Sequence, residues 1–153
     1  MEEPVERVVV VAMVYFDASL KSTSRLYVER RRALDVLEAA LSKGGGRRAM
    51  GSDTLYIFDA CVSRALDAVL ASRKALEGIK AGFGVARGPI YDGDVVAGSC
   101  VGVAARLCAQ HGVLLSQRAA DALDPDHGLR TVPVFLQGSD SSGGLEEFCQ
   151  VLC

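Results

Sequence analysis

The sequence predicts a mixed β-sheet covered by helices, an α/β or α+β fold in a single domain. Short apolar runs typical of buried strands alternate along the chain with longer amphipathic stretches typical of helices. Half of the 153 residues are hydrophobic, which is enough to build one substantial core. Neither an internal repeat nor a linker divides the chain, so we expect one domain over residues 1–153.

The first half of the chain predicts a central strand, a long helix, a hairpin and a second helix. The Val-rich run at 6–16 has almost no polar alternation, which is typical of a strand covered on at least one face. Hydroxyl residues at 22–24 offer N-caps for a helix that ends at three consecutive glycines, 44–46. The remaining elements are a hairpin of 47–50 with 54–58, and a helix at 63–77.

The second half alternates between short apolar strands and small-residue helices. Strands are predicted at 81–90, 95–97, 113–115, 131–136 and 148–152. Helices are predicted at 98–110 and 117–123. The last two strands are expected to form a closing hairpin across a stretch rich in Gly and Ser.

Charge and cysteine usage exclude several classes of protein. The net charge of -2 and the pI near 5.7 give no general attraction to nucleic acid or to an anionic membrane. The apolar run at 8–16 is too short to span a bilayer, and Glu2 and Glu3 precede it where a signal peptide would be basic. The five cysteines, an odd number without a C-x-x-C pair, favour packed, reduced thiols in a cytoplasmic protein over a metal site or disulfide framework.

Six short motifs follow one another in order along the chain and carry a resemblance to a known family. They are a strand ending in an acid, a glycine-led hairpin, a Gly-x-Gly strand, a small-residue helix with Arg-Leu near its end, a Gly-led strand ending in Ser, and a Leu-Gln-Gly. They occupy residues 14–17, 45–58, 82–88, 98–107, 112–116 and 136–138. Together they resemble the catalytic domain of class III adenylate and guanylate cyclases, which has a ferredoxin-like core. The resemblance covers nearly the whole chain.

The resemblance implies a metal site that is incomplete here. The family holds two metal ions with two aspartates from neighbouring strands, and Asp17 stands at the first of these positions. The second position is Ser52, followed by Asp53. Adjacent side chains on a strand point to opposite faces, so Asp53 could replace Ser52 only through a turn or bulge. Asp17 could equally cap the following helix. We expect no cofactor unless nucleotide binding is retained, in which case it would be Mg²⁺ or Mn²⁺.

The nucleotide and transition-state positions also depart from the family. In the loop that cradles the phosphates, Lys21 could contact phosphate or remain solvated. Of the pair that selects the base, Arg48 stands at the Lys position, whereas Val95 cannot form a side-chain hydrogen bond. Gly102 replaces the family's Asn, and Arg106 keeps the Arg position, where it could bind phosphate or pair with a surface acid.

These departures lead to three hypotheses. The first is a catalytically inert cyclase-like domain that acts as a regulatory or partner-binding module, with residual nucleotide binding as an option. The second is a working cyclase, in which a heterodimer borrows groups from an intact partner. The third is an unrelated ferredoxin-like enzyme, although His111 and His127 are isolated and expected in loops or at the surface. Because family active sites form between two subunits, we expect a homodimer or a heterodimer with a cyclase-like domain. The short arm at 89–96 implies an altered dimer geometry.

Overall fold

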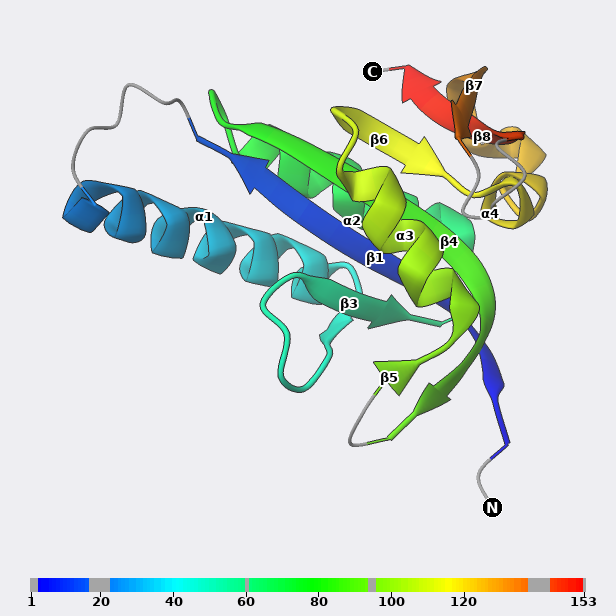
Figure 1. The fold of residues 1–153 in the computed structure, drawn as a ribbon, viewed down its shortest axis with the longest axis horizontal. Coiled ribbons are helices and arrows are strands. Elements are labelled where there is room, and N and C mark those ends of the chain that lie inside the picture. The colour runs from blue at the N-terminus through cyan, green and yellow to red at the C-terminus, as the bar shows by residue number, and fades with distance from the viewer. Residues whose placement is uncertain (1–2, 17–22, 60, 94–95, 138–143, 153) are drawn as a thin grey trace.

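The computed structural model describes residues 3–16, 23–59, 61–93, 96–137 and 144–152 (Figure 1). Its strands are β1 (Val5–Tyr15), β2 (Arg47–Arg48), β3 (Leu55–Phe58), β4 (Lys80–Asp92), β5 (Val96–Ala97), β6 (Gly112–Leu115), β7 (Arg130–Gln137) and β8 (Leu145–Leu152). Its helices are α1 (Thr23–Lys43), α2 (Val62–Ala75), α3 (Ser99–Cys108) and α4 (Gln117–Asp121), with a 3₁₀ turn at Pro125–His127. The predicted fold class is confirmed.

The strands form one mixed sheet in the order β2-β3-β1-β4-β6-β8-β7, and β5 pairs with the far end of β4. Among the described strands, β4 and β6 pair in parallel and the other neighbours are antiparallel. β1 and β4 pair along their length at the centre of the sheet. This position explains the Val-rich sequence of β1, because Val8, Val9 and Val10 are fully buried between elements on both faces.

One face of the sheet is covered by α1 and α2. The inward side chains of α1 include Leu37 and Leu41, and those of α2 include Leu66 and Val69; all four are fully buried against the sheet. α1 has a narrow apolar stripe on its inner side and arginines on its outer side, which is the pattern of a helix lying on a core. Residues 30–32 are mostly exposed, as the sequence predicts.

The other face is covered by α3, which lies directly on β4 (Figure 1). A Cβ atom at Gly84 would overlap the carbonyl oxygen of Ala104, and one at Gly82 would overlap that of Cys108. The Gly-x-Gly sequence of β4 is therefore a packing requirement, since any side chain there would push the helix away from the sheet. Cys100 and Cys108, which belong to α3, are buried as free thiols.

The α3 side of the sheet is covered only in part. Val9 and Val11 of β1 pack in the cluster that contains α3, but Met13, two residues further on the same face, is 44% exposed. Met50, at the end of the β2–β3 hairpin, is 77% exposed. Figure 1 shows α3 crossing β1 and β4 while β3 lies beside them without a covering helix on this side.

One feature differs from the sequence expectation. Cys61 is exposed at the N-cap of α2, although the cysteines were expected to be packed. It can remain exposed because the buried face of α2 begins after this residue.

No helix in the described part of the chain is long and apolar enough to cross a membrane.

Candidate functional site

The end of β1 and the turn between β2 and β3 lie side by side. β1 pairs with β3 so that Val11 lies opposite Leu55, and the Ala12 N–H donates to the Thr54 carbonyl at 3.0 Å. The turn at 51–53 therefore lies next to the last residues of β1. Asp17 itself, two residues beyond β1, lies outside the described residues, as do Lys21 and Val95.

Ser52 holds the turn together with its side chain. Its hydroxyl oxygen accepts hydrogen bonds from the backbone N–H groups of Thr54 at 3.2 Å and Leu55 at 3.1 Å. The preceding Gly51 has φ of 81°, which favours glycine in this tight turn. Ser52 is a neutral residue, and its side-chain oxygen already accepts hydrogen bonds from the local backbone.

Asp53 is paired with an arginine of the same hairpin. Arg48 places its Nη1 3.3 Å from Asp53 Oδ1 and from the Ser52 carbonyl, and its Nε 3.6 Å from Glu38 Oε1 of α1. All three side chains are more than a third exposed, so these pairs add little stability. These contacts do orient the side chains. Arg48 points back toward the turn and α1, and the Asp53 carboxylate faces the Arg48 guanidinium.

Beneath this ion cluster lies a residue that the sequence analysis missed. Tyr56 is fully buried in β3, and its hydroxyl has no hydrogen-bond partner within the described chain. Burial, followed by the negative charge of Glu38, raises the pKa of Tyr56 to about 12. An aromatic residue in an apolar strand gives no sequence signal of this kind, because only the tertiary position of its oxygen matters.

The two transition-state positions lie one helical turn apart on α3. Gly102 is exposed, and a Cβ atom there would meet no described heavy atom within 4 Å. Arg106 donates to Glu146 Oε2 of β8 at 3.1 Å, and its guanidinium carbon lies 5.5 Å from the centre of the Phe148 ring. Arg106 thus pairs with an acid and an aromatic ring on the neighbouring hairpin, the second of its two predicted options.

The fold brings these motifs to one side of the sheet. Ala49, between Arg48 and Met50, is buried in the same cluster as Ala104 of α3. The described residues nevertheless do not fit a metal centre of the expected kind, since Ser52 carries no charge and Asp53 is paired with Arg48. Within those residues, no three His, Cys, Asp or Glu side chains come close enough to hold a metal ion.

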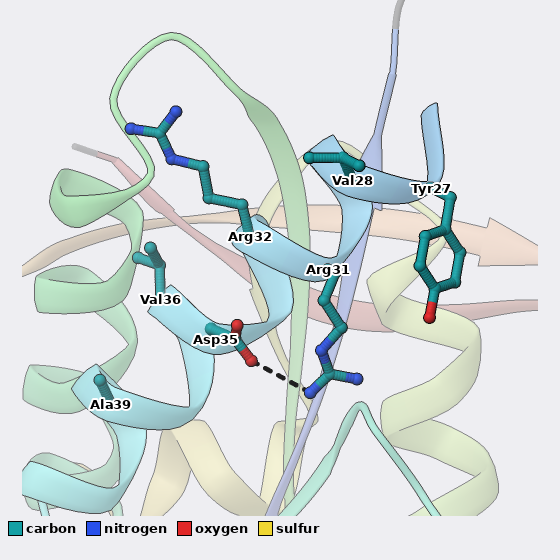
Figure 2. Close-up of a pocket in the computed structure, with 7 residues that line it drawn as sticks. All are labelled: Tyr27, Val28, Arg31, Arg32, Asp35, Val36 and Ala39. Atoms are coloured by element: carbon teal, nitrogen blue, oxygen red, sulfur yellow. Dashed lines mark hydrogen bonds and ion pairs between the residues drawn. The ribbon is translucent and has the colours of Figure 1, made fainter. Parts of the chain in front are cut away.

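A shallow hollow of about 500 Å³ lies elsewhere, on the outer side of α1 (Figure 2). Figure 2 shows Arg31 and Asp35 joined across its floor, at 3.0 Å, with Tyr27 to one side. An ion pair at this spacing is a normal feature of an exposed helix surface. None of the predicted site residues lines this hollow, so we do not regard it as part of the candidate site.

The two histidines are not both at the surface. His111 is exposed, and its ring stacks on Tyr15 with centres 4.5 Å apart. His127 lies in the segment that connects α4 to β7, its side chain is only 12% exposed, and its Nε2 lies 2.8 Å from Asp67 Oδ1. The 3₁₀ turn at Pro125–His127 directs it toward α2, which no local sequence pattern indicated.

Comparison with solved structures identifies the fold, whereas comparison of the sequence with known families and curated proteins finds no match. No protein-family model matches the sequence, and no curated protein is detectably similar to it. Among solved structures, the adenylate/guanylate cyclase/hydrolase of Silicibacter pomeroyi matches with a TM-score of 0.76 over 99% of both chains, at 19% identity. The chain has the nucleotide cyclase fold.

Two fungal structures support the same conclusion. The guanylate cyclase domain of RhGC from Catenaria anguillulae, solved with GTP, matches with a TM-score of 0.77 at 15% identity, over 99% of this chain and 98% of that one. The non-canonical dimeric guanylyl cyclase domain of RhoGC from Blastocladiella emersonii matches with a TM-score of 0.75 at 13% identity, over 98% of each. In this chain Ser52 lies in the turn between β2 and β3, and Gly102 and Arg106 lie on α3.

Proposed function

We propose that this domain is a catalytically inert relative of nucleotide cyclases that acts as a regulatory or partner-binding module. The observation that carries the proposal is the state of the β2–β3 turn. Ser52 stands where the second metal carboxylate is expected, and its oxygen accepts two backbone hydrogen bonds. The adjacent carboxylate, Asp53, is neutralised by Arg48.

The chemistry requires what this turn lacks. A cyclase must neutralise a triphosphate and activate a ribose hydroxyl, and two carboxylates hold the hard divalent ions that do so. Gly102 adds a second loss, since a glycine offers no side-chain donor to the transition state. Removing a single such donor costs on the order of a hundredfold in rate, so the combined losses would leave turnover far below that of a working enzyme.

Partner binding is supported by the uncovered part of the sheet. Met13 continues the row of Val9 and Val11 on the α3 side and is exposed, and Met50 is exposed in the turn between β2 and β3 that also carries Ser52. Exposed apolar patches of this kind commonly mark interfaces. We propose that a second copy of the chain, or a cyclase-like partner, covers this surface in a cytoplasmic assembly. A heterodimer in which an intact partner supplies the missing groups is the alternative that would restore activity.

Product formation by the isolated domain tests the proposal. The purified chain is incubated with ATP or GTP and Mn²⁺ or Mg²⁺, and cyclic nucleotide is quantified while binding heat is measured in parallel. We expect no product, whether or not nucleotide binds. Cyclic nucleotide that disappears in Asp17→Ala but persists in the matched variant Asp35→Ala, which changes an exposed acid of α1, would show a working metal site and overturn the proposal.

A further inference from the structure

A small notch lies where β4 outruns its neighbour β6. The two strands pair only from Gly82 to Val85, and the Ser116 N–H makes the last contact with the Val85 carbonyl at 2.9 Å. β4 continues beyond this point while the chain after β6 turns into α4. The resulting cavity, of about 180 Å³, lies between this free edge, the start of α3 and the start of α4. It is lined by Ala86, Arg87, Gly88, Pro89, Ser99, Cys100, Val103, Ser116 and Arg118.

Two guanidinium groups in this notch share one carboxylate. Arg118 Nη2 donates to Glu6 Oε2 at 3.1 Å and lies 2.9 Å from Oε1. Arg87 Nε lies 3.8 Å from Glu6 Oε1, too far for a hydrogen bond, and this buried nitrogen has no acceptor among the described residues. Glu6 Oε1 is itself buried without a well-aligned donor. The three side chains carry a net charge of +1, with more N–H donors than one carboxylate can satisfy.

The backbone adds donors on the same side. Strand alternation points the Arg87 N–H in the same direction as the Val85 carbonyl, toward the notch. Pro89 follows at the next such position, where a strand edge without a partner tolerates the missing N–H. α3 begins at the rim with Gly98 as its N-cap, which has no side chain to accept from the first turn, and Cys100 packs against Gly88.

We propose that this notch binds a small oxyanion of phosphate type, held by Arg87 and Arg118 with the first turn of α3. Guanidinium groups match the geometry of tetrahedral oxyanions, and the orphaned Arg87 Nε is the donor that such a ligand would satisfy. The volume of the cavity limits the size of the ligand. Sites for whole small-molecule ligands occupy about 300–1,000 Å³, so 180 Å³ suits an inorganic ion or the terminal phosphate of a larger molecule. This site is independent of whether the domain is a cyclase.

Titration by two-dimensional ¹H–¹⁵N NMR tests the site at residue level. Inorganic phosphate is added to the full chain at pH 7.5, with sodium chloride of equal ionic strength as the blank. O-phosphoserine in a second titration distinguishes free phosphate from a phosphate ester. We expect saturable shifts at the amides of Arg87, Ser99 and Cys100 with at least one of the two probes. Saturation by neither probe, or shifts spread without a focus on this notch, would overturn the proposal.

Matched variants separate a site from general charge attraction. Arg118→Gln removes the more exposed guanidinium, and we expect roughly tenfold weaker phosphate binding, because a charge-assisted pair of hydrogen bonds is lost. Arg87→Gln should weaken binding at least as much if that variant folds. Arg130→Gln, which changes an exposed arginine on β7, should leave affinity unchanged. Equal affinity in Arg118→Gln and Arg130→Gln would contradict the proposal even if the Arg87 variant does not fold.

Discussion

The two faces of the sheet differ in how fully helices cover them. On the α1 and α2 side, the apolar residues of β1, β3, β4 and β6 meet two helices, and the largest side chains, Phe58 and Phe83 among them, are buried. On the α3 side, a short helix of small residues covers the middle of the sheet, and Met13 of β1 lies exposed beyond it. The same strands contribute side chains to both faces, so the contrast arises from the helices that cover each face.

Strand β1 shows the contrast within one segment. Val8, Val10 and Ala12 alternate toward the long helices and are buried, and Val14 continues that row packed against the same core while partly buried. Val9 and Val11 alternate toward α3 and are buried, but Met13 continues that row into solvent. On one face the side chains of β1 pack into the core, whereas on the other face the row starts in the core and ends at an exposed residue. The following changes should affect the two faces very differently.

The largest loss is expected on the face that α1 and α2 cover. Leu37→Ala in α1 removes a fully buried side chain from a packed interior, and we expect about 3 kcal/mol less free energy of unfolding, from lost transfer energy and the cavity left behind. Met13→Ala, at the uncovered end of β1, should cost the isolated chain less than about 1 kcal/mol. Urea denaturation of both variants measures the two values; similar losses would erase the contrast between the faces.

A second loss is expected where α3 lies on the sheet. Gly84→Ala places a methyl group into the Ala104 carbonyl, and since backbone atoms must move we expect about 2 kcal/mol of destabilisation. Thermal unfolding, compared with the parent chain, is the measurement. A variant as stable as the parent would mean that α3 is not held as closely as the structure shows.

An alkaline transition should report the buried hydroxyl of Tyr56. Its folded-state pKa of about 12 exceeds the unfolded value of 10.0, so the protonated form favours folding. This contribution is fully present below pH 10 and is lost as pH rises toward 12, by roughly 2 kcal/mol in total.

The matched variant for this prediction is Tyr56→Phe. It removes the titrating group and an unpartnered buried oxygen, and its free energy of unfolding, measured in urea between pH 8 and 12, should fall less than that of the parent. Parallel curves for the two proteins would show that the hydroxyl is hydrated or partnered.

The smallest expected effect is a gain on the open side of α3. Gly102→Ala adds a methyl group where no described atom lies within 4 Å, and alanine is a better helix former than glycine. We expect the free energy of unfolding to rise by about 0.5–1 kcal/mol in calorimetry. A loss instead would indicate that another surface already packs against this glycine.

Much of the fold follows from the sequence because its signals are local. Each of several elements has its own local signal: the Val-rich run of β1, the glycines that end α1, and the alternating strands of the final hairpin. These elements occur where they were predicted. The parallel pairing of β4 with β6 and the notch it leaves could not be predicted, since they depend on which strands become neighbours.

The sequence could name candidate site residues but not their contacts. Motif order singles out Ser52, Gly102 and Arg106. It could not show that Ser52 accepts two backbone hydrogen bonds or that Arg106 reaches Glu146, 40 positions further along the chain. Such contacts depend on side-chain geometry between distant segments, for which a single sequence carries no periodic signal.

The central claim is that the partly covered α3 face is completed by a second chain, and the molar mass in solution tests it most directly. Light scattering of the purified chain from about 10 to 200 µM should give the mass of a dimer of the 16.2 kDa chain at the upper concentrations. Met13→Lys should shift it to the monomer, whereas Tyr27→Lys, a matched change at an exposed residue of α1, should remain dimeric. A monomer mass for the parent throughout, or a dimer that Met13→Lys leaves intact, would contradict the claim.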